Sequence, residues 1–84
     1  MATRDFSGDD VVRVLVNNGP FYLDRMSGSH MILKWDPPES HDSDPRTVTV
    51  PRHDSLMIGT LQKIAEQAGA KDFDRFCDWV QENR

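Results

Sequence analysis

Hydrophobic residues recur in this chain at two different spacings, and each spacing predicts a different kind of element. Residues 8–18 carry their apolar side chains along one helical face, namely Val11, Val12, Leu15 and Val16. Ser7 precedes this segment, and Asp10 follows at the spacing of a capping box. We therefore expect an amphipathic helix over residues 8–18 that ends at Gly19 and Pro20.

The next two apolar segments, residues 21–26 and 30–35, have the composition of β-strands and are separated by the turn Ser27-Gly28-Ser29. This arrangement predicts an antiparallel hairpin. Because successive side chains of a strand point to opposite faces, the second strand should present two sets of side chains. These are His30, Ile32 and Lys34 on one face, and Met31, Leu33 and Trp35 on the other.

The second half of the chain predicts a loop, a strand and two helices. Residues 36–45 contain three prolines and four acidic residues, which favours a solvated loop, and residues 46–50 then alternate as a third strand that ends at Pro51. Helical spacing marks the two helices: Leu61, Ile64, Ala65 and Ala68 for the first, and Phe73, Phe76, Cys77 and Val80 for a last helix over residues 72–82. Gly69 should cap the first of these helices. The expected fold class is α+β: a helix, a three-stranded antiparallel sheet, a helix and an extra C-terminal helix.

The length of 84 residues favours one domain over residues 1–84 and leaves little room for a deep cavity. We therefore expect any activity on a shallow surface, which suits a polymeric substrate. The lone Cys77 excludes an intramolecular disulfide and offers no paired-cysteine zinc site. The N-terminus lacks the apolar stretch of a signal peptide, and no segment is apolar enough to cross a membrane, so we expect a cytoplasmic protein with no membrane partner.

The net charge of the chain is negative, whereas proteins that bind nucleic acids usually have a basic surface. Fourteen acidic residues against ten basic ones give a net charge of −4. The acidic residues crowd the 36–45 loop and the C-terminal region, whereas residues 21–35 and 46–60 are close to neutral. Asp outnumbers Glu, and Arg outnumbers Lys, a composition typical of proteins from salt-loving archaea. In molar salt the Debye length falls to about 3 Å, so an acidic surface repels RNA only weakly.

His30 is the strongest candidate for chemistry, because histidine side chains take and give protons near neutral pH. It stands at the start of a predicted strand, beside a turn. Removal of a proton from a ribose 2′-hydroxyl would let RNA supply its own nucleophile, without a metal. Gly28 allows a backbone to approach a phosphate, and the hydroxyl of Ser29 can orient a phosphate oxygen. From these residues alone, a hydrogen-bonded surface histidine at an ordinary turn is the favoured interpretation.

Further RNA-contact candidates flank this turn. Arg25 precedes it, and Lys34 shares the predicted strand face of His30. His53 follows the third strand and is a candidate RNA contact or second acid–base group. His41 lies in the acidic loop at no ligand-like spacing from the other histidines, so we predict no metal site.

Three motifs occur in order along the chain: Gly28-Ser29-His30, then Thr-Val-Thr-Val-Pro-Arg-His at residues 47–53, then Gly59-Thr60-Leu61. Over roughly residues 7–69, this ordered set resembles the HicA family. HicA-like proteins are small toxin ribonucleases of bacterial and archaeal toxin–antitoxin pairs. Residues 70–84 then form a C-terminal helical extension of the family core.

The resemblance implies a fold similar to the double-stranded RNA-binding domain, with His30 as the catalytic residue. It implies an mRNA-cleaving endoribonuclease and a HicB-like antitoxin protein that covers His30. From the residues themselves we expect no metal requirement and no cofactor. No DNA binding is expected of the toxin alone.

The chain departs from the HicA pattern in three respects. HicA proteins are typically basic, often carry Lys or Arg just before the glycine-serine-histidine turn, and tend to end soon after the second helix. Here Ser27 precedes Gly28, the connection between the later strands is acidic, and a third helix is appended. Two alternatives therefore stay open: a noncatalytic RNA-binding module in which His30 is a contact residue, and a protein-interaction domain favoured by the negative charge and the apolar last helix.

Overall fold

The computed structural model describes residues 5–38 and 44–84. The elements follow in the order α1 (Gly8–Asn17), β1 (Tyr22–Ser27), β2 (His30–Trp35), β3 (Arg46–Pro51), α2 (Ile58–Gln67) and α3 (Phe73–Asn83). This order confirms the predicted α+β fold class. The central part of the predicted acidic loop, with Glu39, His41 and Asp42, lies outside the described residues.

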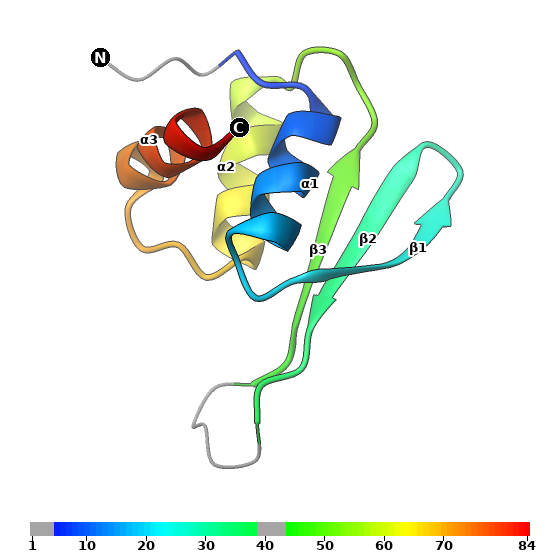
Figure 1. Ribbon diagram of the computed structural model, residues 1–84. Helices are drawn as coiled ribbons and strands as arrows, with labels where there is room; N and C mark the ends of the chain where they lie inside the picture. Colours follow the sequence, from blue (N-terminus) through cyan, green and yellow to red (C-terminus); the bar gives the residue numbers. More distant parts are fainter. Residues whose placement is uncertain (1–4, 39–43) are drawn as a thin grey trace.

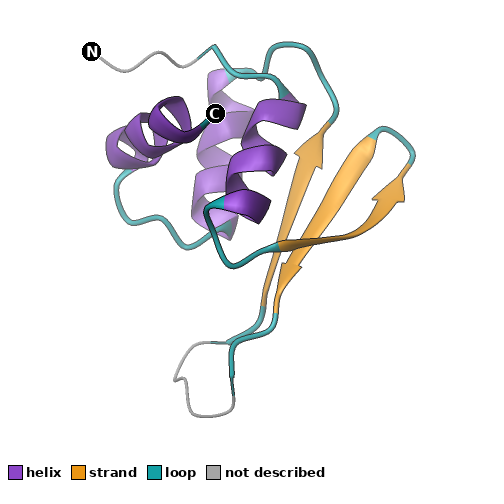
Figure 2. Ribbon diagram, viewed as in Figure 1, coloured by secondary structure: helices purple, strands orange, loops and turns teal. Residues whose placement is uncertain are grey.

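The elements form layers (Figure 1). The antiparallel sheet has the strand order β1-β2-β3. Helices α1 and α2 both pack against the sheet, and α3 packs on these two helices on the side away from the sheet. The β1–β2 hairpin extends past the helices (Figure 2), which explains why every residue of β1 is exposed.

The core fills the space between the sheet and the helices. Its fully buried side chains come from every layer and include Leu15, Leu33, Val48, Leu61, Ile64 and Val80. The prediction for α1 was too narrow, since Val14 is also completely buried and Val12 and Val16 are only partly so. The reason is that α1 lies between the sheet and α3, so its buried face is wider than one amphipathic stripe.

The pairing of β1 with β2 contains an irregularity that the sequence analysis did not predict. The register shifts between Leu23 and Arg25, which leaves Asp24 as the extra residue of a β-bulge. Beyond the bulge Arg25 is opposite Ile32, and Ser27 is opposite His30. Because directly paired residues share a face, Arg25 lies on the same face as His30 and Lys34, and the bulge brings Tyr22 to that face as well.

Ile32 is more buried than expected for this face. The prediction placed it with His30 and Lys34 on the face opposite Met31 and Leu33, yet only 8% of Ile32 is exposed. It lies in the central strand between Arg25 of β1 and Thr49 of β3, and does not belong to the main core cluster. Flanking side chains on both neighbouring strands therefore shield this central position.

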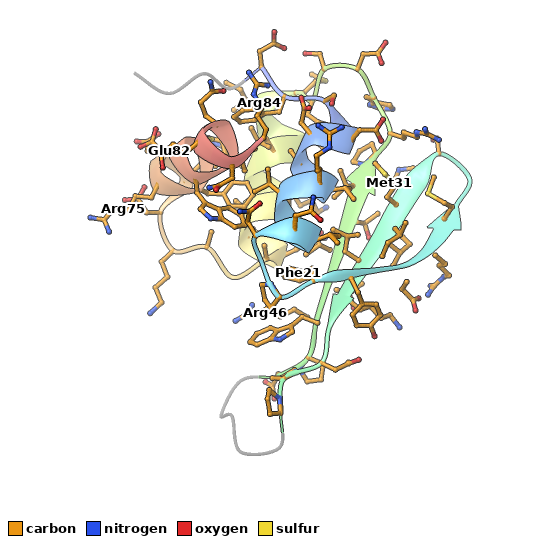
Figure 3. All side chains as sticks on the ribbon, in the orientation of Figure 1. Phe21, Met31, Arg46, Arg75, Glu82 and Arg84 are labelled. Carbon is orange, nitrogen blue, oxygen red and sulfur yellow. The ribbon has the colours of Figure 1, made fainter. Side chains whose placement is uncertain are left out.

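The ends of α1 and α2 are fixed by local hydrogen bonds. The predicted capping box is present, since Asp10 N–H donates to the Ser7 hydroxyl and Ser7 N–H donates to the Asp10 carboxylate. At the end of α2, Gly69 N–H donates to Glu66 O and Ala70 N–H donates to Ala65 O, the bonds of a Schellman motif. Gly69 has a φ of +85°, which favours glycine, and the Arg46 guanidinium packs against it (Figure 3).

The start of α1 lies against the end of β3. Gly8 N–H donates to the carbonyl of His53 at 2.9 Å, and a Cβ at Gly8 would overlap the carbonyl oxygen of Pro51. Arg84 closes the same end of the molecule from α3 (Figure 3): its guanidinium lies over the Phe6 ring at 4.9 Å and donates to the carbonyl of Asp5. The Gly8 contacts hold the start of α1 against the end of β3, whose last residue, Pro51, is paired with His30.

Candidate functional site

His30 stands at the first position of β2, at the end of the sheet from which the β1–β2 turn projects. It is opposite Ser27 of β1 and Pro51 of β3. Gly28 adopts a φ of +60°, the left-handed conformation that the turn requires. The turn is also tied to β3, since Arg52 N–H donates to the carbonyl of Ser29 at 2.7 Å. The backbone that carries His30 is therefore supported from both neighbouring strands.

The His30 side chain lines a hollow of about 250 Å³. The sheet contributes His30, Thr49 and Pro51 to its wall, and α2 contributes Thr60, Lys63, Ile64 and Gln67. The His30 imidazole is exposed and makes no hydrogen bond to any residue in the described ranges, so both of its nitrogens are available to a ligand. We call this feature the His30 hollow.

Gln67 connects α2 to the open edge of β3. Its Oε1 accepts a hydrogen bond from the backbone N–H of Thr49 at 3.0 Å, a donor that no further strand could satisfy because β3 is an edge strand. This bond holds α2 against the sheet edge beside His30. Because Oε1 is the acceptor, the amide nitrogen of Gln67 is left as a donor.

The sequence analysis missed the three polar residues that α2 contributes to the His30 hollow: Thr60, Lys63 and Gln67. A signal for them exists, because they are spaced by three and four positions and so form a polar stripe along one side of α2. The hydrophobic pattern predicted the buried face of this helix. It did not predict which other element the polar stripe would meet.

The cations predicted on the β1 side of His30 are compensated by one carboxylate. Nη1 of Arg25 lies 2.6 Å from Oδ2 of Asp24, and Nζ of Lys34 lies 3.9 Å from the same oxygen. The bulge residue Asp24 therefore supplies an acid that pairs with both of these cations on the His30 face. Neither residue lines the His30 hollow.

The remaining predicted residues lie around the hollow. Gly28 and Ser29 form the exposed turn directly before His30. His53 is exposed in the loop after β3, where its carbonyl anchors α1, and it does not line the hollow. The Arg52 guanidinium lies 3.5 Å from the carboxylate of Asp9. The structure thus brings none of the other predicted contact residues into the wall that holds His30.

The aromatic residues divide between core and surface. Phe21 and Trp35 pack against each other with ring centroids 6.5 Å apart. Tyr22 is 43% exposed and is opposite Lys34, so it lies on the outer face of the sheet. Its hydroxyl donates to Asp36 at 2.7 Å, and this hydrogen bond raises the pKa of Tyr22 above its ordinary value. Tyr22 is the one of these three rings that is available for stacking on a base.

A larger hollow of about 480 Å³ lies between the end of α1, the α2–α3 connection and α3. Its wall is mostly apolar, with Leu15, Phe21, Phe76 and Trp79, and no histidine or cysteine lines it. It lacks a group that exchanges protons near neutral pH. The smaller His30 hollow is therefore the better candidate for chemistry.

Metal-binding clusters and membrane-spanning helices are both absent from residues 5–38 and 44–84. No group of three or more His, Cys, Asp or Glu side chains in these ranges is arranged to hold a metal ion. None of the described helices is long and apolar enough to span a membrane.

The protein has a small α+β fold. Its His30 hollow combines an exposed histidine with the ammonium of Lys63, two threonines and the amide of Gln67 on an open surface. The family described as the HicA toxin of bacterial toxin–antitoxin systems matches residues 8–70. The chain belongs to the HicA toxin family, as its motifs indicated, and is therefore a toxin of a toxin–antitoxin pair. The match ends before α3. No curated protein and no solved structure matches the chain.

Proposed function

We propose that this HicA-family toxin is an endoribonuclease that cleaves mRNA with His30 as the acid–base group. The observation that carries the proposal is the exposed imidazole of His30 in a hollow that also presents Lys63 and the threonine hydroxyls. An acid–base group next to a cation suits a reaction that moves a proton and develops negative charge on a phosphate. The open position of the hollow suits a polymer.

In the proposed reaction RNA supplies the nucleophile. His30 takes the proton of a ribose 2′-hydroxyl, and the 2′ oxygen forms a bond to the adjacent phosphorus. The bond from phosphorus to the 5′ oxygen of the next nucleotide breaks, that oxygen takes a proton from solvent, and His30 releases its proton to solvent. The products are a 2′,3′-cyclic phosphate and a 5′-hydroxyl, and no step requires a metal ion or a cofactor.

The other predicted residues would bind the RNA around this centre. Gly28 lets the turn approach a phosphate closely, and Ser29 offers a hydroxyl beside His30. Arg25, Lys34 and His53 would contact phosphates outside the His30 hollow, along the outer face of the sheet and in the loop after β3.

The proposed partner is a HicB-like antitoxin that covers His30. A net charge of −4 disfavours an interface held mainly by an acidic antitoxin surface. Large apolar side chains are exposed on β1 and at the start of α2, namely Leu23, Met26, Met57 and Ile58. These favour an apolar contact, so the complex should persist in molar potassium chloride. Dissociation in high salt would contradict an apolar interface.

The proposed activity is tested with a labelled mRNA, purified wild-type protein and His30→Ala. Cleavage is measured in dilute and in molar potassium chloride, with a chelator present, and both proteins are checked for folding. We expect cleavage by the wild type alone. An all-DNA strand of the same sequence should stay intact, because it lacks the 2′-hydroxyl.

The same experiment tests the alternatives. RNA binding without cleavage by folded wild-type protein would support a noncatalytic RNA-binding module. An absence of RNA affinity in both salt conditions would support a protein-interaction domain. Equal cleavage by wild type and His30→Ala would contradict the role of His30.

A further inference from the structure

We propose that Lys63 of α2 is the phosphate-binding cation of the His30 site, and that α2 rather than β1 supplies the charge that holds the scissile phosphate. The inference rests on the proposed ribonuclease function. It names a residue that no sequence motif indicated. The geometry that supports it is the shared wall of the His30 hollow, in which Lys63 and His30 come from different elements.

The first support is the arrangement of the hollow. His30 is fixed at the start of β2, while Lys63 extends from the middle of α2. The hydrogen bond from Thr49 N–H to Gln67 holds the helix to the sheet edge, so the two functional side chains keep a defined relation. A phosphate in a hollow of about 250 Å³ would meet both groups.

The second support is charge. Arg25 and Lys34 share the carboxylate of Asp24, and a phosphate would have to compete with this acid for both cations. Lys63 is exposed, and among the described residues it makes no ion pair. An uncompensated ammonium gains more from an incoming anion than a cation that already has a partner.

The third support is the character of the other α2 groups. The amide nitrogen of Gln67 is a donor, because the amide oxygen is engaged by Thr49. The hydroxyl of Thr60 can donate as well, and it lines the same hollow. The polar stripe of α2 therefore offers hydrogen-bond donors beside a positive charge and no carboxylate, a combination that recognises an anionic oxygen.

The test measures RNA binding and cleavage separately. Binding is measured in the His30→Ala background, so that the RNA stays intact, with a labelled single-stranded RNA over a series of potassium chloride concentrations. Lys63→Gln should weaken binding and reduce the slope of log affinity against log salt by about 0.7, the value for one lost phosphate contact. With His30 present, Lys63→Gln should reduce cleavage at low RNA concentration roughly tenfold.

The matched control is Lys71→Gln, which removes the same charge from an exposed lysine outside the His30 hollow. It should leave the salt slope near that of the parent protein. Lys63→Arg should retain the slope, because it keeps the positive charge. Thermal unfolding of each variant checks that the fold is intact.

Each outcome decides a different claim. If Lys63→Gln matches Lys71→Gln in slope and cleavage while His30→Ala is inactive, Lys63 does not bind the phosphate and the ribonuclease proposal stands. A loss of cleavage by Lys63→Gln without a change in slope would also overturn the inference, since it indicates a structural role. Full cleavage by His30→Ala would instead overturn the proposed function itself.

Discussion

The two sides of His30 differ in how their positive charges are compensated. On the β1 side, Arg25 and Lys34 lie around the single carboxylate of Asp24. On the α2 side, Lys63 stands in the wall of the His30 hollow without an ion pair among the described residues. A protein with a net charge of −4 can therefore present a cation that has no acidic partner among the described residues. The placement of acids beside particular cations matters more than their total number.

The largest effect should separate the two histidines near the sheet end. His30→Ala should reduce RNA cleavage by about 10²–10⁴-fold, the usual contribution of general acid–base catalysis. His53→Ala should reduce it less than roughly tenfold, because His53 lies outside the hollow and would lose at most one phosphate contact. Initial cleavage rates of the two folded variants measure this difference. Equal losses would place His53 in the reaction with His30.

The next effect concerns the backbone that supports His30. Gly8→Ala would place a methyl group against the carbonyl of Pro51, the residue opposite His30, and should lower the free energy of unfolding by about 1–3 kcal/mol. Gly59→Ala is the matched control, because space around Gly59 is open and alanine favours a helix by up to about 1 kcal/mol. Urea unfolding compares the two. A neutral Gly8→Ala would contradict the close approach of α1 to β3.

A smaller effect is expected from the capping box of α1. The hydrogen bond from Ser7 N–H lowers the pKa of Asp10 below its ordinary value. Its contribution to stability is therefore present above the unfolded-state pKa and is lost as the pH falls through the lowered folded-state pKa. Ser7→Ala should cost about 1 kcal/mol near neutral pH. Thermal unfolding against pH should show a smaller acid-induced loss in Asp10→Asn, which has no carboxylate to titrate, whereas Ser7→Ala keeps the backbone N–H and should retain most of that loss.

The smallest effect would make the two sides of His30 more alike. Asp24→Asn removes the carboxylate shared by Arg25 and Lys34, so both cations should become available to RNA phosphates. Affinity in the His30→Ala background should rise a fewfold, since exposed ion pairs are worth only about 0.2–1 kcal/mol. The slope of log affinity against log salt should become steeper. Weaker binding in this variant would show that Asp24 positions these cations and does not mask them.

The sequence predicted the elements well because they follow from periodicity. The helical spacing of Leu61 and Ile64, and the Ser7 and Asp10 capping box, depend on neighbours within one helix. The motif around Gly28 and His30 also led to the correct family. These signals are local, so they could be recognised without knowledge of the fold.

The parts that escaped prediction depend on contacts between distant elements. Alternation along a strand could not reveal the β-bulge at Asp24, although an aspartate within a strand is a weak indication of one. The buried face of α1, which includes Val14, is wide because the helix lies between the sheet and α3. Lys63 becomes part of the candidate site only because α2 lies along the edge of β3, where Gln67 meets Thr49. A contact between two distant elements leaves no pattern in the sequence of either segment.

The central claim is that His30 activates the 2′-hydroxyl of RNA. The most direct test is mass spectrometry of the ends that wild-type protein produces from a defined RNA in the presence of a chelator. The account predicts a 2′,3′-cyclic phosphate on one fragment and a 5′-hydroxyl on the other, with no cleavage where the ribose at the cut site lacks its 2′-hydroxyl. Fragments with a 3′-hydroxyl and a 5′-phosphate would contradict it, because water rather than the RNA would then be the nucleophile.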